Sequence, residues 1–263
     1  MGERIPATDI KKIELSILDY ISEVCKENNI NYFLAYGTLL GAIRHRGFIP
    51  WDDDIDLYML REDYMKFIRV VSNKQDERYR LFTIYNDDSF YYEFAKVIDS
   101  KTILHVENVK DNPNEGVWVD IFPLDKISKR VKIQKSIINV SVACRILSVY
   151  KKFPSEKRNK VFYPLWLVSK NIGPRFFLRL TEKIAMSGQN DEMVGYMASM
   201  GVSRFYFPKK WCDKICLVEF EGKTYPAFEQ YDNYLKFQYG DYMQLPPEEK
   251  RRCHPVEAYW KEK

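Results

Sequence analysis

The chain has 263 residues, of which 46% are hydrophobic and 30% are charged, and its net charge is +4. This balance is typical of an ordinary soluble globular protein, and the length allows one large domain or one domain with a sizeable insertion. No run of about 18 apolar residues is present, which argues against a membrane-spanning helix. The N-terminus lacks the apolar segment of a signal peptide, so we expect a cytoplasmic protein.

The cysteines do not form a disulfide framework, because their number is odd, five, and their spacing is irregular. Cys212 and Cys216, taken with Cys253 and His254, leave a zinc site open as an alternative. Free thiols fit the loose spacing of these residues better.

The first half of the chain alternates between helical and strand patterns. Apolar residues near a 3.6-residue period predict an amphipathic helix over residues 8–29, with Thr8 or Asp9 as its N-cap. A short buried strand at 32–36 then leads through a glycine turn into a short helix at 38–46. Further strands are expected at 54–59, 80–85, 92–98, 102–106 and 117–122, with a helix at 62–72.

Beyond residue 128 the pattern is mainly helical. Residues 129–183 are expected to form helices interrupted by prolines. Residues 215–225 predict a β-hairpin that turns at Glu221-Gly222, and residues 227–239 predict a helix that ends at the next glycine.

These patterns indicate an α+β fold in three parts. Residues 1–125 form a core with a mixed sheet and flanking helices, residues 126–200 form a helical insertion, and residues 201–263 add a hairpin and a helix that pack back on the core. Within the insertion, residues 126–183 hold 15 lysines and arginines against two glutamates, a net charge of +13. Such a basic segment with interleaved aromatic residues suits an anionic membrane surface, although a charged helical face is more often plain solvated surface.

Three aspartates are candidates for a metal site. Asp54 and Asp56 are two residues apart on a predicted strand, so their carboxylates point to the same face, about 7 Å apart. Asp120 interrupts the apolar run 117–122, where an aspartate is costly unless it is paired, hydrogen-bonded or bound to a metal. Carboxylates bind hard divalent cations, and a helix that opens at Gly37-Thr38 offers amides to phosphate oxygens.

Other readings of these residues are open. An acidic run such as WDDDID is often a solvated loop, and a single aspartate in a strand is often structural. An EF-hand that starts at Asp52 does not fit, because its sixth residue is Leu57 instead of glycine and its twelfth is Asp63 instead of glutamate.

The segment Tyr36–Leu57, YGTLLGAIRHRGFIPWDDDIDL, closely resembles the signature of LicD-type phosphocholine transferases, which are relatives of the fukutin proteins. The resemblance runs from about residue 31 to residue 254. Supporting segments are FAKVIDSKT (Phe94–Thr102), GVWVDIFPLD (Gly116–Asp125) and YLKFQYGDYMQLPPEEKR (Tyr234–Arg251). It implies a nucleotidyltransferase-like core in which Gly37-Thr38 is the glycine motif, Asp54 and Asp56 are the metal pair, and Asp120 is the third acid.

The resemblance also implies a function. The chain would be a phosphotransferase that uses Mg²⁺, as two ions, with Mn²⁺ as a substitute. It would move phosphocholine from CDP-choline to a sugar of a lipid-linked cell-surface glycan precursor, such as a teichoic acid of the cell wall, at the inner face of the membrane. Open alternatives are transfer of another phospho-alditol, nucleotidyl transfer to a small molecule, and a non-catalytic scaffold. No RNA-binding motif is present, so no nucleic-acid partner is expected.

Further residues are candidates for substrate binding. Arg44, His45 and Lys96 could hold the diphosphate of the donor. A quaternary ammonium group needs an aromatic cage, for which Trp51 and Trp118 are candidates. The alternatives are solvated surface for the basic residues and core packing for the aromatic ones.

Overall fold

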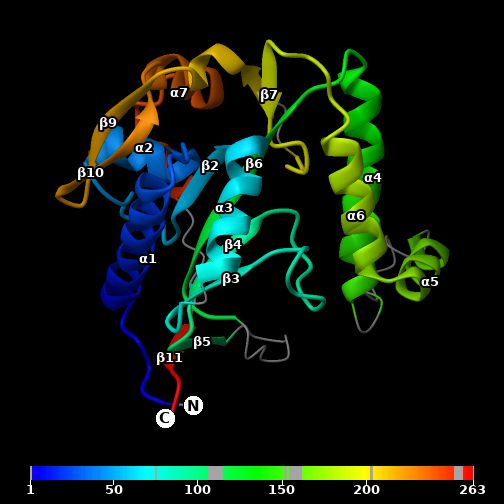
Figure 1. Cartoon of the computed structure of the whole chain (residues 1–263), viewed down its shortest axis with the longest axis horizontal. Coiled ribbons are helices and arrows are strands. Elements are labelled where there is room, and N and C mark those ends of the chain that lie inside the picture. Colours follow the sequence, from blue (N-terminus) through cyan, green and yellow to red (C-terminus); the bar gives the residue numbers. More distant parts are fainter. Residues whose placement is uncertain are drawn as a thin grey trace. The chain divides into compact units, whose positions relative to one another are not determined.

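A computed structural model of the chain describes residues 2–74, 76–105, 115–150, 153, 162–201, 204–251 and 257–262. The chain divides into two compact units (Figure 1). We call them the sheet unit, which comprises Met1–Phe82, Ala95–Pro123 and Lys210–Lys263, and the helical unit, which comprises Thr83–Phe94 and Leu124–Lys209.

The sheet unit is built on a sheet with the strand order β1-β2-β6-β4-β3. The strands are β1 (Phe33–Leu34), β2 (Asp56–Leu60), β3 (Tyr79–Phe82), β4 (Ala95–Asp99) and β6 (Trp118–Lys126). The antiparallel register of β4 and β6 sets Lys96 opposite Asp120. The mixed α and β content and the central sheet expected from the sequence are therefore confirmed.

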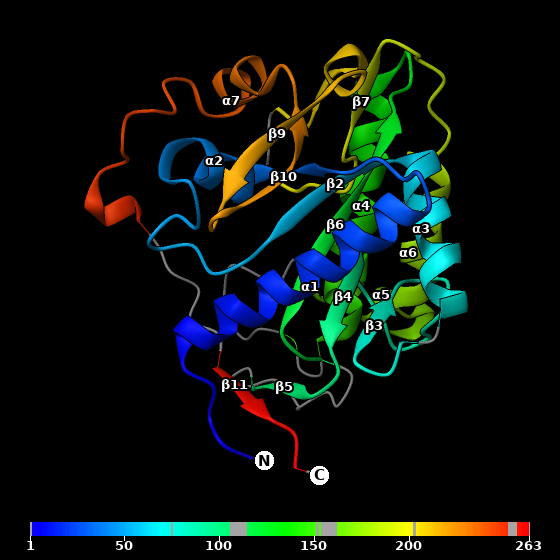
Figure 2. The same cartoon turned by 60° about the vertical axis from the view of Figure 1, so that its left-hand side comes forward.

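Three helices belong to the first part of the sheet unit: α1 (Ala7–Glu27), α2 (Tyr36–His45) and α3 (Arg61–Lys74). Figure 2 shows α1 running across the sheet, and its apolar stripe is buried as the 3.6-residue period predicts. The N-cap prediction was wrong, because the helix begins directly after Pro6, which has extended backbone angles. Asp9 lies instead in the first turn, where a negative charge favours the helix dipole.

Several strand boundaries differ from the prediction. The strand expected at 54–59 begins only at Asp56, so Asp54 lies in the preceding loop. The strand expected at 32–36 is shorter, because Tyr36 already starts α2. The strand β5 (Thr102–His105) was expected, but its antiparallel partner β11 (Glu257–Trp260) was not.

The C-terminal part of the sheet unit contains the predicted hairpin. Strands β9 (Ile215–Phe220) and β10 (Lys223–Phe228) are joined by Glu221 and Gly222. Both turn residues have positive φ, 50° and 76°, as a tight two-residue hairpin turn requires. Helix α7 (Tyr231–Tyr239) starts later than expected because β10 continues to Phe228, and the short helix η3 (Glu248–Lys250) follows it.

The helical unit contains α4 (Val131–Val149), α5 (Tyr163–Ile172) and α6 (Pro174–Ala185). Helices α4 and α6 pack side by side (Figure 1). Two short strands were missed from sequence, β7 (Met193–Gly195) and β8 (Tyr206–Pro208); β7 pairs with β8 and with the end of β6, and the short helix η2 (Lys209–Cys212) follows. Among the described helices, none is both long and apolar enough to span a bilayer.

Candidate active site

The loop before β2 is fixed against the start of α2. The hydroxyl oxygen of Thr38, a buried residue of α2, accepts a hydrogen bond from the Asp56 amide at 2.8 Å. A side chain at position 37 would collide with the Asp52 carboxylate, so only glycine allows this carboxylate to approach the N-terminus of α2. Tyr36, directly before it, has a φ of 40°, a left-handed conformation that is strained for a residue with a side chain and is frequent at functional sites.

The structure brings Asp54, Asp56 and Asp120 together. The backbone amide of Asp120 on β6 donates a hydrogen bond of 3.0 Å to the carbonyl of Ile55, the residue between the other two aspartates. We call these three aspartates the acidic centre. Asp54 reaches the other two aspartates although it does not lie on a strand. It is placed there by the loop before β2, which continues directly into Asp56.

The acidic centre is electrostatically unfavourable without a cation. Burial raises the pKa of Asp54 to about 7, and the charges of Asp52 and Asp120 contribute to this rise. The pKa of Asp56 is raised well above its ordinary value by burial and then by Asp54 and Asp120. Burial also raises the pKa of Asp120. Ionised carboxylates in this position repel one another, so a bound cation would stabilise all three.

Lys96 is the positive charge next to the acidic centre. Its Nζ lies 3.2 Å from Asp120 Oδ1 and 4.1 Å from the centroid of the Trp118 ring. The lysine and the aspartate side chains are only 14% and 11% exposed. Lys96 therefore serves as counter-ion to Asp120, and its ammonium group covers the ring that was a candidate for a choline cage.

Glu14 is a further acid that the sequence analysis missed. It lies on the buried side of α1, it is 2% exposed, and its Oε2 has no hydrogen-bond partner. Its pKa is raised well above the ordinary value by burial and by the charges of Asp54 and Asp53. The signal in the sequence was a glutamate within the apolar stripe of an amphipathic helix.

The donor atoms at the acidic centre suit a hard divalent cation such as Mg²⁺, because they are carboxylate oxygens that carry more negative than positive charge. Within the described part of the chain, however, no group of three or more His, Cys, Asp or Glu side chains has the geometry to hold a metal ion. Cys212 and Cys216 are free thiols, and the other two members of the zinc alternative, Cys253 and His254, lie outside the described residues.

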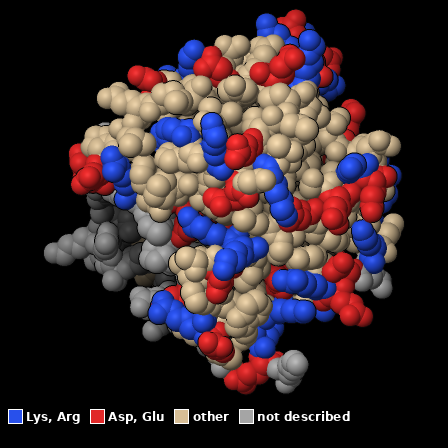
Figure 3. Space-filling view, turned by 90° about the vertical axis from the view of Figure 1, so that its left-hand side faces the viewer, with Lys and Arg blue, Asp and Glu red and all other residues tan. Residues whose placement is uncertain are grey.

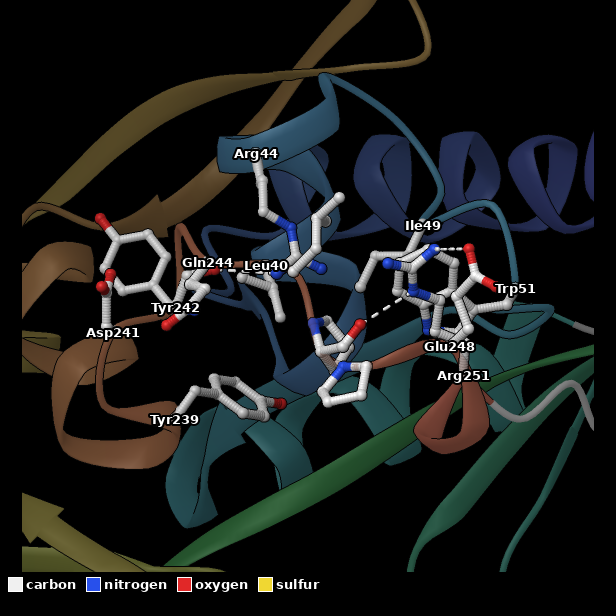
Figure 4. A pocket seen from close by; sticks show the side chains of 13 residues that line it. Leu40, Arg44, Ile49, Trp51, Tyr239, Asp241, Tyr242, Gln244, Glu248 and Arg251 are labelled. Carbon is white, nitrogen blue, oxygen red and sulfur yellow. Dashed lines mark hydrogen bonds and ion pairs between the residues drawn. The ribbon is translucent and has the colours of Figure 1, made fainter.

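A pocket of about 660 Å³ in the sheet unit is lined by two further predicted residues, Arg44 and Trp51 (Figure 4). We call it the Arg44–Arg251 pocket. Its lining comes from α2, from the loop before β2, from the end of α7 and from the segment that follows α7: Leu40, Arg44, Ile49, Trp51, Tyr239, Asp241, Tyr242, Gln244, Leu245, Pro246, Pro247, Glu248 and Arg251. It adjoins the acidic centre at Tyr239, whose pKa is raised by burial and by Asp56.

The predicted residues of this pocket have defined partners. Arg44 donates a hydrogen bond of 2.8 Å to the carbonyl of Tyr242 and one of 3.4 Å to Nδ1 of His45. Burial and the charge of Arg44 lower the pKa of His45. The guanidinium of Arg251 lies 4.9 Å from the centroid of the Trp51 ring, so a protein cation already covers this tryptophan as well.

The loop before β2 separates two pockets. Ile49 and Trp51 line the Arg44–Arg251 pocket, whereas Pro50, Asp52 and Asp53 line a second pocket of about 620 Å³ next to the start of α1. Side chains of one short loop therefore reach both pockets, and the acidic centre follows directly in the chain.

Comparisons with known proteins agree with the motif. A family model described as LicD/FKTN/FKRP, nucleotidyltransferase domain, matches residues 29–139. Over 256 residues, 93% of this chain and 94% of the relative, the protein is 32% identical to lipopolysaccharide cholinephosphotransferase LicD of Haemophilus influenzae. An uncharacterized protein of Rickettsia prowazekii is 34% identical over 104 residues, 40% of this chain and 36% of the relative. Ribitol 5-phosphate transferase FKRP of Homo sapiens is 46% identical over 44 residues, 17% of this chain and 9% of that protein.

The matched residues 29–139 include all three aspartates of the acidic centre and the helix that precedes them. The resemblance inferred from the segment Tyr36–Leu57 is thereby confirmed. Because the similarity to the Haemophilus influenzae protein extends along nearly the whole of both chains, this protein belongs to the LicD family.

Proposed function

We propose that the protein transfers phosphocholine from CDP-choline to a sugar hydroxyl of a cell-surface glycan precursor of the teichoic acid type, with Mg²⁺ as cofactor. The observation that carries the proposal is the acidic centre, where Asp54, Asp56 and Asp120 meet around the hydrogen bond between Asp120 and Ile55. The similarity to a cholinephosphotransferase over 93% of the chain supports the reaction, and the family model supports a nucleotidyltransferase-like core.

In this mechanism Asp54, Asp56 and Asp120 would hold the metal ion, which would neutralise charge on the phosphoryl oxygens. The sugar oxygen would bond to the phosphorus that carries choline while CMP leaves, and Asp120 would accept the proton of the attacking hydroxyl. Lys96 keeps the Asp120 carboxylate oriented through their ion pair. Thr38 fixes the backbone of Asp56, and Gly37 leaves room for the Asp52 carboxylate.

The experiment is product analysis by mass spectrometry with CDP-choline, Mg²⁺ and a lipid-linked glycan precursor. A gain of phosphocholine by the acceptor supports the proposal, whereas a gain of a nucleotide or an alditol phosphate replaces it by one of the alternatives. Asp56→Asn should lower the rate of product formation by about 10³-fold. Asp213→Asn, at an exposed residue of the same unit, is the matched control. A non-catalytic scaffold would yield no product with any donor.

A second candidate is transfer of a phospho-alditol such as ribitol phosphate from a CDP donor. Two observations favour it: the 46% identity with FKRP over 44 residues, and the cations that already cover Trp51 and Trp118. If neither tryptophan is available, choline needs other aromatic residues. Thermal-shift measurements with CDP-choline and CDP-ribitol distinguish the two donors, because the true donor stabilises the fold by mass action.

The helical unit supports a further part of the proposal, contact with an anionic membrane surface at the inner face of the cell membrane. Helix α5 carries an unusual share of exposed apolar side chains, and α4 and α6 add more: Ile133, Ile137, Val140, Leu165, Leu167, Val168, Ile172 and Phe176. The segment 126–183 is strongly basic, which complements anionic lipid head groups. Lys151, Lys152, Lys157 and Arg158, which contribute to this charge, lie outside the described residues.

A further inference from the structure

Two guanidinium groups face the Arg44–Arg251 pocket without an adequate counter-ion. Among the described residues, no carboxylate accepts a hydrogen bond from either group: Arg44 donates to the carbonyl of Tyr242 and to His45, and Arg251 donates to the carbonyl of Pro246. The acidic contact of Arg251 is Glu248, at 3.8 Å and with a side chain that is 89% exposed, a geometry that contributes little. The pocket lining also contains Asp241 and Glu248, but neither carboxylate accepts a hydrogen bond from the two guanidinium groups.

The charge of Arg251 acts on Arg44. Burial lowers the pKa of Arg44, the charge of Tyr239 opposes this shift, and the charge of Arg251 adds to it. An anion that contacts both guanidinium groups would be attracted by two positive charges. A guanidinium binds phosphate oxygens through parallel N–H donors, which makes phosphate the best-matched anion.

Arg251 is held in place by an aromatic ring. Its guanidinium stacks on Trp51, and its Nε donates a hydrogen bond of 2.9 Å to the carbonyl of Pro246 (Figure 4). These contacts use the ring face and Nε of the guanidinium, and Nη1 lies 3.8 Å from Glu248 Oε1. Because Trp51 immediately precedes the aspartate run, the ring links the arginine to the loop of the acidic centre.

The pocket also has the surroundings that a nucleotide requires. Tyr239 and Tyr242 add aromatic surface, and Asp241 and Gln244 add polar groups. Arg44 enters from α2, whose first turn contains Thr38 and Gly37, so one short helix contributes to both the pocket and the acidic centre. Arg44 follows Thr38 by six positions of helix, a span of roughly 9 Å along the axis.

We propose that the Arg44–Arg251 pocket binds the diphosphate of the nucleotide donor, with Arg44 and Arg251 contacting phosphate oxygens and Trp51 acting as the positioning residue for Arg251. The assignment rests on the proposed function, which supplies a nucleotide donor. It assigns a role to Arg251, for which the sequence gave none beyond the family resemblance.

The test is isothermal titration calorimetry of the full chain in Mg²⁺ with cytidine, CMP, CDP and inorganic pyrophosphate. Arg44→Gln and Arg251→Gln should each weaken CDP binding by about tenfold or more, CMP binding by less, and cytidine binding by less than about twofold. Arg69→Gln, which removes an exposed arginine on α3, should leave all four affinities unchanged. Pyrophosphate that binds as tightly as CDP would show that the site takes a free anion instead of a nucleotide, and would overturn the proposal.

A double-mutant cycle tests the role of Trp51. Trp51→Leu should weaken CDP binding in the wild-type background and have little further effect when Arg251 is already glutamine. Equal effects in both backgrounds would overturn the positioning role. Arg251→Lys keeps the charge without the planar fork, and an affinity between wild type and Arg251→Gln is expected.

The outcomes separate this inference from the proposed function. If the wild-type protein transfers phosphocholine while Arg44→Gln and Arg251→Gln both bind CDP normally, the pocket assignment is wrong and the function stands. If CDP binding requires both arginines but no phosphocholine is transferred, the function is wrong and the pocket assignment stands. Melting temperatures should confirm that both variants fold, since neither guanidinium is hydrogen-bonded to a carboxylate.

Discussion

The two units treat buried charge in opposite ways. In the helical unit Arg145 donates two hydrogen bonds, of 2.9 and 2.8 Å, to the Glu93 carboxylate. In the same unit Lys135 donates hydrogen bonds to the carbonyls of Met197 and Ser199. At the acidic centre of the sheet unit, three aspartates share one nearby lysine. A buried charge lowers the stability of the fold unless an opposite charge or hydrogen bonds compensate it. Buried charges that are paired therefore indicate a structural role, whereas poorly compensated ones indicate a site that binds a ligand.

On the face that Figure 3 shows, acidic and basic side chains are interspersed. The charge pattern of this face gives no sign of the acidic centre. The relevant signal is the combination of burial and missing partners, which Glu14 shows most clearly.

The largest effect is expected at the acidic centre. Asp56→Asn should lower the rate of phosphocholine transfer by about 10³-fold, because the metal and the phosphoryl charge lose a principal ligand. In the absence of Mg²⁺ the same variant should melt at a higher temperature than wild type, since one of the repelling carboxylates is removed. Steady-state rates in Mg²⁺ measure the effect on transfer, and calorimetry in EDTA measures the effect on the melting temperature. A variant that loses activity and stability together would show that Asp56 has a structural role.

The reverse is expected in the helical unit. Glu93→Gln should lower the free energy of unfolding by about 3 kcal/mol, because it leaves the buried Arg145 guanidinium without its carboxylate. Urea denaturation provides the measurement. Activity at a temperature where the variant is folded should remain near that of wild type. An unchanged urea midpoint would remove the distinction drawn between the two units.

The sequence predicted those elements whose pattern is local. The helix α1, the hairpin β9–β10 and its Glu221-Gly222 turn each follow from residues within a few positions of one another. The strands β7 and β11 were missed because they are only three and four residues long and pair with distant segments. Short strands of this kind acquire their structure from a partner that periodicity does not reveal.

The same division applies to the site. The two aspartates of the DID motif and Asp120 could be identified because a carboxylate in an apolar strand pattern is unusual. The prediction that Asp54 lies on the strand was wrong, because β2 begins at Asp56 and Asp54 lies in the loop before it. Arg251 had no local signal, since its importance depends on the ring of Trp51, 200 positions away in the chain.

The acidic centre also predicts a pH dependence. The pKa of Asp54 is raised from the ordinary 3.8 to about 7, so the folded protein binds this proton more tightly than the unfolded chain. The corresponding stabilisation is complete below about pH 4 and is lost as the pH rises through about 7. In EDTA, the melting temperature of wild type should therefore fall more between pH 5 and pH 8 than that of Asp54→Asn. If the melting temperatures of both proteins fell equally, the burial of this carboxylate would be contradicted. Adding Mg²⁺ at pH 8 should raise the melting temperature of wild type but not that of Asp54→Asn.

The smallest expected effect concerns the outer surface of the helical unit. Val168 and Ile172, four residues apart on one side of α5, are 55% and 47% exposed. Val168→Ser and Ile172→Ser should each weaken binding to vesicles with anionic lipids by roughly fivefold, about 1 kcal/mol for an apolar side chain that enters the interface. Vesicle co-sedimentation at low and high salt measures this. Leu217→Ser, on β9 of the sheet unit and 66% exposed, is the matched control. If Leu217→Ser weakens binding as much as the α5 variants, or if salt has no effect, membrane contact is not a property of the basic helices, and their exposed apolar side chains require another partner.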